Sequence, residues 1–193
     1  MKKIQIALTD KNEIEKYRQI LEKNKYELTD NAYDIFDLLK ISQAQKPDMV
    51  IIDPSLPYLS SLEWGKKLLE DKSTKMLFYI TSEYSDDVIE KVKLNAVSGC
   101  LIRPVEESNL IPAIKTAFAH YEALDKLKYN YTQIEKKIDD LRTIEKAKDI
   151  IMKENSVDSI KADEILEEIS ISKKMEKIQV AKILTLTNKQ GGN

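Results

Sequence analysis

The feature that most constrains this chain is a long helix-forming stretch, from about Ile114 to Met152, that contains neither proline nor glycine. Large apolar residues recur within it every seven positions, in two series separated by alternating steps of three and four. This spacing is typical of two helices wound around each other. The alternative is a single amphipathic helix lying on its own domain, and we expect that arrangement for Ile111–Phe118. Beyond it we predict a dimerisation seam formed by Leu124, Leu127, Tyr131, Ile134, Ile138 and Leu141, with mixed charges on the positions between.

The chain before this stretch alternates short apolar segments with amphipathic ones. Such an alternation predicts an α/β fold, with a doubly wound five-stranded parallel sheet and helices on both faces. Strands are expected at Lys3–Leu8, Tyr26–Leu28, Met49–Ile52, Met76–Ile80 and Cys100–Ile102. Helices are expected at Lys11–Lys23, around a stripe of Ala32, Ile35, Phe36 and Leu39, at Ser61–Glu70, and at Asp86–Leu94 with Ser85 as its cap.

Composition narrows the class of protein and its compartment. Lysine and arginine total 31 against 33 aspartate and glutamate, so bulk charge points to neither a nucleic-acid nor a membrane partner. Cys100, the only cysteine, lies in an apolar setting, which favours a reducing compartment over a disulfide framework. No apolar run approaches the roughly 18 residues of a membrane span. We therefore expect a cytoplasmic protein, and no metal cluster, phosphate loop or nucleophile triad in the sequence suggests an enzyme.

Polar residues gather where the predicted strands end. Asp10, Asp53, Thr81 and Arg103 each follow an apolar strand segment. The carboxyl ends of parallel strands are where ligands and chemistry collect in such sheets, so these side chains should meet at one edge. Two carboxylates can hold Mg²⁺ through oxygen ligands, and a metal-bound aspartate could attack a phosphoryl donor while the hydroxyl and the cation steady the transferred oxygens.

The order and spacing of these motifs resemble the receiver domain of two-component response regulators. The matching residues are Pro47-Asp48-Met49-Val50-Ile51-Ile52-Asp53, Leu56-Pro57, Ile80-Thr81-Ser82 and Arg103-Pro104, and the resemblance covers roughly residues 1–118. It implies that Asp53 is the phosphoacceptor, that Asp10 and Asp53 bind Mg²⁺, and that Thr81 and Arg103 contact the phosphate. It also implies a histidine kinase or another sensor protein as a partner.

The chain departs from the receiver pattern at several positions. Thr9 replaces the first of two acids, Arg103 replaces a lysine, Cys100 replaces the switch aromatic, and Pro54 has no N–H to donate. Each site residue also has a purely structural alternative. Asp10 and Glu13 could form a capping box that opens the first helix, Asp53 could begin a turn, and Thr81 could bond to the loop backbone.

After the coiled stretch, two further short helices are expected. Asp158 can cap a helix over Ser159–Ile169, and Ser172 can cap another over Lys173–Thr187. The apolar residues expected to face inward on these helices are Ala162, Ile165, Leu166 and Ile169 on the first and Met175, Ile178, Ala181 and Leu184 on the second. With the end of the long helix they would make a three-helix bundle.

This last unit resembles the ANTAR domain, an RNA-binding output domain of some response regulators. The resemblance is carried by Ile144, Ala147-Lys148, Ile151-Met152, Ala162, Leu166, Ser170 and Val180-Ala181. It implies transcription antitermination, in which a dimer binds paired RNA hairpins in a leader transcript. Acidic residues at Asp163, Glu167 and Glu168 depart from the family, so cations must gather locally to meet RNA phosphates. We expect Lys173, Lys174 and Lys177 at the start of the third helix to do so, joined by Lys146 and Lys148.

The sequence thus predicts a receiver-like domain over 1–118, a coiled-coil dimerisation helix over 119–143, an ANTAR-like three-helix domain over 144–187 and a tail over 188–193. The expected function is a transcription antiterminator that binds hairpin RNA as a dimer under receiver control. One alternative is a regulator that acts through protein partners without binding RNA. A DNA-binding regulator is a second alternative, although no predicted helix combines exposed arginine, asparagine and glutamine as base readout requires.

Overall fold

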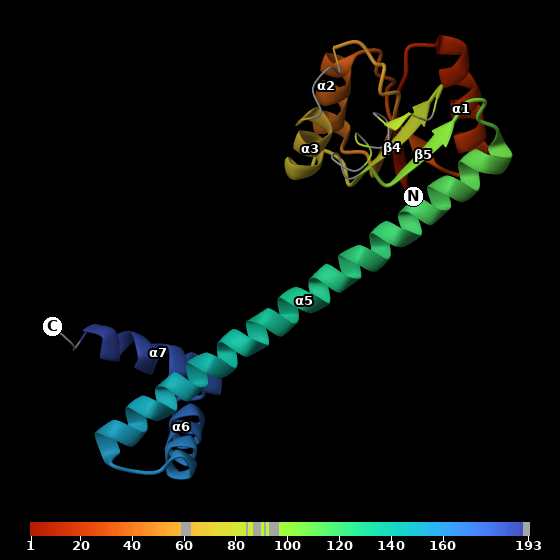
Figure 1. The fold of residues 1–193 in the computed structure, drawn as a ribbon. Coiled ribbons are helices and arrows are strands. Elements are labelled where there is room, and N and C mark those ends of the chain that lie inside the picture. Colours follow the sequence, from red (N-terminus) through yellow and green to blue (C-terminus); the bar gives the residue numbers. More distant parts are fainter. Residues whose placement is uncertain (59–62, 84, 87–89, 91, 93–96, 191–193) are drawn as a thin grey trace. The chain divides into compact units, whose positions relative to one another are not determined.

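The computed structural model describes residues 1–58, 63–83, 85–86, 90, 92 and 97–190 (Figure 1). The chain divides into two compact units, Met1–Leu124 and Asp125–Asn193. No helix of the described residues combines the length and the apolar character that a membrane crossing requires.

The first unit is built on a five-stranded parallel sheet in the order β2-β1-β3-β4-β5. The prediction of a parallel α/β sheet is therefore confirmed. All residues of β3 and β4 are buried, as expected of central strands covered on both faces. The strands are β1 (Lys3–Ala7), β2 (Glu27–Leu28), β3 (Met49–Ile52), β4 (Met76–Thr81) and β5 (Gly99–Ile102), and the helices are α1 (Lys11–Lys23), α2 (Ile35–Gln45), α3 (Glu63–Glu70) and α5 (Glu107–Asn155).

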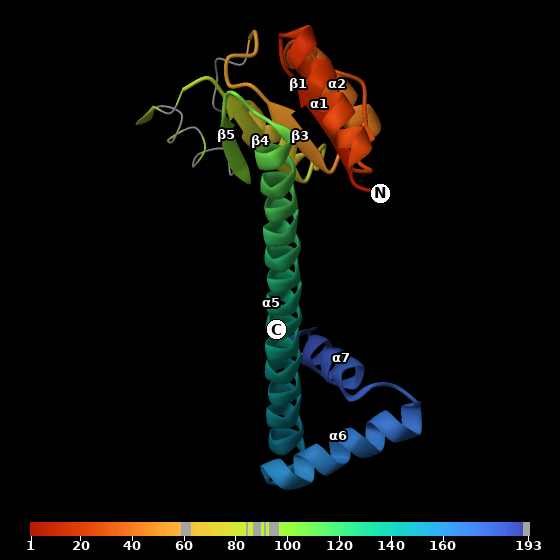
Figure 2. The ribbon, with the colours of Figure 1, turned by 90° about the vertical axis from the view of Figure 1, so that its right-hand side faces the viewer.

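Alternate residues of each strand supply two separate hydrophobic clusters. On β3, Met49 and Ile51 join the cluster that includes α1 and the beginning of α5, whereas Val50 and Ile52 join the cluster that includes α2 and α3. The sheet is therefore covered by helices on both faces, as the doubly wound arrangement requires. Figure 2 shows α1 and α5 from the side of the first face.

The second predicted helix is shifted relative to expectation. It begins at Ile35 with Asp34 as its cap, so Ala32 lies before the helix, and Ile35 and Leu38 are its buried apolar residues. Phe36, expected on the inner stripe, is 66% exposed. The predicted buried face of this helix is therefore wrong at Phe36. The apolar residues at 35, 36, 38 and 39 have the spacing of two overlapping helix faces, and the structure buries the face that contains Ile35 and Leu38. Most of the helix expected at 86–94 lies outside the described residues.

Helix α5 begins at Glu107, several residues before the predicted start, and Pro112 lies inside it. Leu110, Ile114 and Ala117 are buried in the cluster formed with α1, so the prediction that this first part packs on its own domain is confirmed. The seam side chains further along are between 44% and 63% exposed.

The second unit has its own small core, formed by Ala147, Ile151, Ala162, Leu166, Val180 and Ala181. Its further helices are α6 (Ser159–Lys173) and α7 (Lys177–Gln190). Asp158 caps α6 as predicted, because its carboxylate accepts a hydrogen bond from the Lys161 N–H at 2.8 Å.

The predicted start of the third helix is wrong. Helix α6 continues through Ser172, whose hydroxyl donates to the Ile169 carbonyl at 3.0 Å instead of capping a new helix. The chain then turns at Lys174, which has a left-handed backbone with φ of 52°. The Met175 N–H closes the turn by donating to the Ser170 carbonyl at 3.0 Å.

Candidate functional site at the sheet edge

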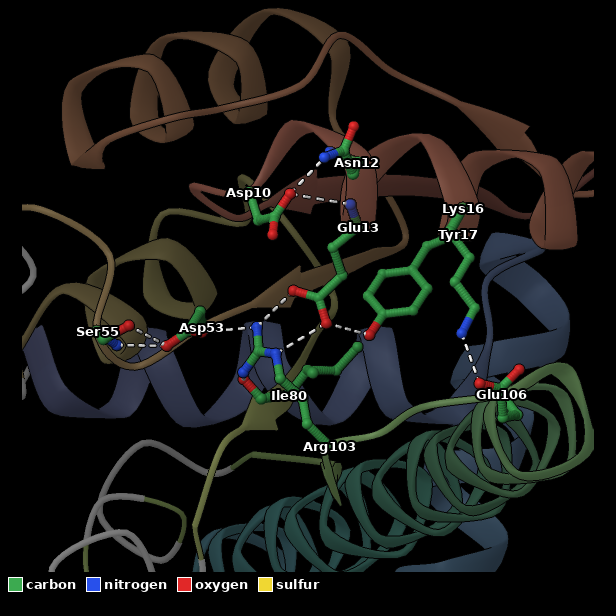
Figure 3. Close-up of polar contacts among 10 residues, drawn as sticks. All are labelled: Asp10, Asn12, Glu13, Lys16, Tyr17, Asp53, Ser55, Ile80, Arg103 and Glu106. Atoms are coloured by element: carbon green, nitrogen blue, oxygen red, sulfur yellow. Dashed lines mark hydrogen bonds and ion pairs between the residues drawn. The ribbon is translucent and has the colours of Figure 1, made fainter.

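Arg103, just after β5, lies between two carboxylates at the carboxyl edge of the sheet (Figure 3). Its Nε and Nη2 donate to the two carboxylate oxygens of Glu13, each at 2.8 Å. Nη2 also lies 2.7 Å from Oδ2 of Asp53, and Nη1 donates to the Ile80 carbonyl at 3.2 Å. We call Glu13, Arg103 and Asp53 the edge triad.

The edge triad is assembled by three neighbouring parts of the fold. Asp53 directly follows β3, and its N–H donates to the Ala7 carbonyl at 3.1 Å, which extends the pairing of β3 with β1. Arg103 directly follows β5, and its N–H donates to the Thr81 carbonyl at 2.9 Å. Glu13 lies in the first turn of α1, so helix and sheet must pack before the triad can form.

Partial burial strengthens these ion pairs. The side chains are 22% exposed for Arg103, 17% for Glu13 and 12% for Asp53. Burial alone would lower the pKa of the Arg103 guanidinium, but its hydrogen bonds to Glu13 and the charges of Asp53 and Glu13 outweigh burial and raise that pKa. Arg103 is therefore a fixed positive charge at the sheet edge.

Tyr17 supports Glu13 from one turn further along α1. Its hydroxyl donates to the same Oε1 of Glu13 that Arg103 binds. Burial, and then the bond to Glu13, raise the pKa of the Tyr17 hydroxyl well above its usual range. Tyr17 therefore stays protonated and helps to hold the Glu13 carboxylate.

The other predicted site residues take part in local backbone contacts. Asp10 caps α1, and its Oδ1 accepts from the N–H groups of Asn12 at 2.8 Å and Glu13 at 3.3 Å. Oδ1 of Asp53 accepts from the N–H and hydroxyl of Ser55, the former at 2.7 Å. The Thr81 hydroxyl donates to the Glu83 carbonyl at 3.1 Å. The structural alternatives for Asp53 and Thr81 are thus present, and Asp10 is a helix cap.

A capping box at Asp10 and Glu13 is only half correct. Asp10 is the cap, but the Glu13 carboxylate binds Arg103 and Tyr17. No local pattern pairs Glu13 with a residue 90 positions away. Its separation of four residues from Tyr17 on one helix face was the only available signal for their contact.

The residues at this edge do not fit a Mg²⁺ ion in this arrangement. Both oxygens of Asp53 are in contact with Ser55 and Arg103, and one oxygen of Asp10 is committed to the helix cap. Within the described ranges, no group of three or more His, Cys, Asp or Glu side chains is placed to hold a metal ion. Binding of Mg²⁺ by Asp10 and Asp53, which remains a prediction, would require Arg103 to leave Asp53.

The predicted RNA-contacting lysines occupy different environments in the second unit. Lys146, Lys173 and Lys174 are exposed. Lys148 pairs with Glu145 at 3.1 Å. Lys177 pairs with Asp163 at 2.9 Å and Glu167 at 3.3 Å. Only Lys177 of the expected cluster belongs to α7, since Lys173 ends α6 and Lys174 is its cap.

The sequence of residues 6–115 matches the family described as response regulator receiver domain. The chain belongs to the response regulator receiver family. Its receiver fold agrees with solved structures of that family. The chemotaxis response regulator CheY4 of Vibrio cholerae superposes with a TM-score of 0.55 at 19% identity, over 61% of this chain and 98% of CheY4. A CheY-like receiver domain protein of Methanospirillum hungatei gives 0.58 at 20% identity, over 64% of this chain and 98% of that one. At these identities the likeness supports the fold alone.

Two relatives in sequence differ in how much of this receiver protein they match. Protein PilH of Pseudomonas aeruginosa is 26% identical over 121 residues, 62% of this chain and 99% of PilH. The transcriptional regulatory protein PdtaR of Mycobacterium tuberculosis is 21% identical over 139 residues, 72% of this chain and 67% of PdtaR. A stretch of that length cannot end before position 139, so the similarity to PdtaR continues past the end of the receiver match at residue 115 and further along α5.

Membership of the receiver family implies a signalling partner for this chain. Receiver domains interact with a kinase or another sensor partner and generally bind Mg²⁺ at an acidic site. In this receiver domain, Arg103 stands beside the Asp53 carboxylate at 2.7 Å. The Glu13 and Asp53 carboxylates at this edge are therefore already paired with a positively charged side chain, that of Arg103.

Proposed function

We propose that this protein is a transcription antiterminator of the response-regulator type, which binds hairpin RNA as a dimer under the control of its receiver domain. The observation that carries the proposal is the similarity to a transcriptional regulatory protein, PdtaR, which extends along α5 past the end of the receiver match. The ANTAR resemblance of the helices after α5 supports an RNA output. The division we propose is a receiver over 1–118, a dimerisation helix over 119–143, an RNA-binding bundle over 144–187 and a tail over 188–193.

The bundle's buried residues are those that carry the ANTAR resemblance. Ala147, Ile151, Ala162, Leu166 and Ala181 are each 3% exposed or less. Alanine at three of these positions, Ala147, Ala162 and Ala181, lets the helices approach closely. A bundle of this kind can present surface lysines without using them in its core.

The lysines offer unequal support for RNA binding. Lys173 and Lys174 follow one another at the turn between α6 and α7, both exposed, and can contribute to phosphate neutralisation together. Lys177 is held by Asp163 and Glu167, so RNA phosphates would have to compete with two carboxylates for it. We therefore expect Lys173 and Lys174 to contribute more to RNA affinity than Lys177.

Control by the receiver would act at the edge triad. A phosphoryl group on Asp53 would meet the Arg103 guanidinium, which is already 2.7 Å from Oδ2 and presents several donors to anionic oxygens. If Arg103 turned toward such a group, it would loosen its bidentate contact with Glu13 and so alter the start of α1. A sensor protein that binds this edge could shift the same contacts without phosphorylation.

A titration of the full chain against tandem-hairpin RNA tests the proposal. It is run with and without beryllofluoride and Mg²⁺, beside Asp53→Ala, and an unstructured RNA of equal length is the control. We expect the protein to bind the hairpin RNA more tightly than the control RNA. Beryllofluoride should increase this affinity in the native chain and not in Asp53→Ala. Equal binding of the hairpin RNA in every condition would show that the receiver domain does not control RNA binding. Failure to bind any RNA while a protein partner is retained would instead support a regulator that works through protein contacts.

A further inference from the structure

The seam on α5 is a row of large side chains that pack against no hydrophobic cluster of the described part of the chain. Its members are Leu124, Leu127, Tyr131, Ile134, Ile138 and Leu141, each at least 44% exposed. None of them belongs to the three buried clusters. Water-exposed rows of this length are costly to leave uncovered and mark a surface that another molecule covers.

Helix α5 meets α7 away from the seam. Asp140 pairs with Lys182 of α7 at 3.3 Å. At 3.6 residues per turn, Asp140 points roughly 100° away from Leu141 and roughly 160° away from Ile138. The side of α5 that faces α7 is therefore not the seam, and the seam stays open to a second helix.

The seam has the spacing that pairs with a copy of itself. Leu124, Tyr131 and Ile138 occupy the first position of successive heptads, and Leu127, Ile134 and Leu141 occupy the fourth. In a parallel pair each residue faces its own copy. In an antiparallel pair first positions face fourth positions, and all of the seam is used when Leu124 faces Leu141 of the second copy.

The charges beside the seam distinguish the two orientations. In a parallel pair, Lys137 on one helix lies beside Arg142 on the other, and this repulsion occurs twice by symmetry. Glu135 lies beside the neutral Asn130. The parallel arrangement therefore has two like-charge contacts and no opposite-charge contact to offset them.

In the antiparallel pair with Leu124 facing Leu141, the nearest flanking positions include one attractive contact and no repulsive one. Lys128 lies beside Glu135 of the second copy, again twice by symmetry, and Lys137 lies beside the neutral Asn130. Like charges such as Glu135 and its copy are offset along the helix axis by five residues, roughly 7.5 Å, so the repulsion between them is weaker than the attraction in the direct contacts. Charge complementarity thus favours the antiparallel pair.

We propose that the seam binds a second copy of this chain in antiparallel orientation, with Leu124 facing Leu141, Leu127 facing Ile138 and Tyr131 facing Ile134. The proposal rests on the dimer of the proposed function and adds its direction and register. In this arrangement the two Leu124 residues are separated along the axis by 17 residues of helix, or about 25 Å. In a parallel pair they touch.

Disulfide trapping of the full chain in a Cys100→Ser background distinguishes these geometries. Leu124→Cys and Leu141→Cys are oxidised separately and as an equimolar mixture. The antiparallel pair predicts cross-linked dimer only in the mixture, and cross-linking of Leu124→Cys alone would overturn it. Sedimentation of the native chain runs beside this test. A monomer would contradict the dimer of the proposed function as well, whereas a dimer that traps in parallel contradicts only the orientation.

Charge variants test the same orientation without a cysteine in the seam. Glu135→Lys should weaken dimerisation about tenfold in the antiparallel pair, since two attractive contacts become repulsive, and adding Lys128→Glu should restore it. Arg142→Glu is the matched variant, which should leave an antiparallel dimer nearly unchanged. Tightening by Arg142→Glu with no effect of Glu135→Lys would refute the antiparallel pair.

Discussion

Replacing Glu13 by Gln tests whether the edge triad stabilises the receiver. Gln is nearly the same size as Glu, so the substitution removes the negative charge without leaving a cavity. Arg103 would lose a bidentate ion pair in which both contacts measure 2.8 Å. It would keep Asp53 at 2.7 Å and the Ile80 carbonyl at 3.2 Å.

The cost follows from how far the pair is buried. Breaking a fully buried ion pair by removing one partner costs about 3–5 kcal/mol, whereas an exposed pair contributes about 0.2–1 kcal/mol. Glu13 and Arg103 are 17% and 22% exposed, and Asp53 still balances the arginine, so the loss lies between these limits. We expect about 2 kcal/mol, which for a domain of this size lowers the melting temperature by roughly 6–8 °C.

Urea unfolding followed by the fluorescence of Trp64, the only tryptophan, measures this loss in the first unit. The matched control is Glu15→Gln on the same helix, where an exposed carboxylate accepts a hydrogen bond from the Gln19 amide at 3.1 Å. The control should change the free energy of unfolding by less than about 0.5 kcal/mol. If Glu13→Gln behaves like Glu15→Gln, the triad does not stabilise the fold and our account of it is wrong.

Three further changes have defined outcomes. Gly99→Ala should cost about 1–3 kcal/mol in urea unfolding, because a Cβ at Gly99 would lie 2.5 Å from the buried Phe78 ring, and Phe78→Leu in the same chain should recover part of it. The pKa of the Tyr17 hydroxyl is raised in the folded chain, so the hydroxyl contributes fully to the free energy of unfolding below about pH 10 and loses this contribution as the pH rises further. The stability of Tyr17→Phe should therefore approach that of the native chain with increasing pH. Asp158→Ala should cost the second unit about 1 kcal/mol by removing the cap of α6, seen as faster amide exchange in α6 while β3 is unchanged.

The sheet could be read from the sequence because its signals are local. Met49–Ile52 is apolar throughout, and β3 has those bounds. Asp10 and Asp158 each precede a helix pattern, which predicts that they cap it, and both accept the expected backbone hydrogen bonds. The positions of Asp53, Thr81 and Arg103 at strand ends followed from the same pattern, since parallel strands end at one edge.

The predicted helix boundaries and faces differ from the structure where two local patterns fit the same residues. Ser172 has the chemistry of a helix cap, but α6 continues through it, because the left-handed turn at Lys174 closes that helix through the Met175 N–H. Phe36 fits an apolar stripe by spacing and is exposed, because the packing of α2 on β3 selects Ile35 and Leu38.

The sequence by itself therefore determined the order of strands and helices, the residues at the strand ends and the seam spacing, since each depends on neighbours within a few positions. Tertiary structure decided the partners. Glu13 and Arg103 are 90 residues apart, and only the packing of α1 beside β5 brings the guanidinium onto both Glu13 and Asp53. Lys177 likewise looked available for RNA until α6 placed Asp163 and Glu167 beside it. The sequence shows which side chains are charged, but whether a charge is neutralised depends on which residues the fold places within a few ångströms of it.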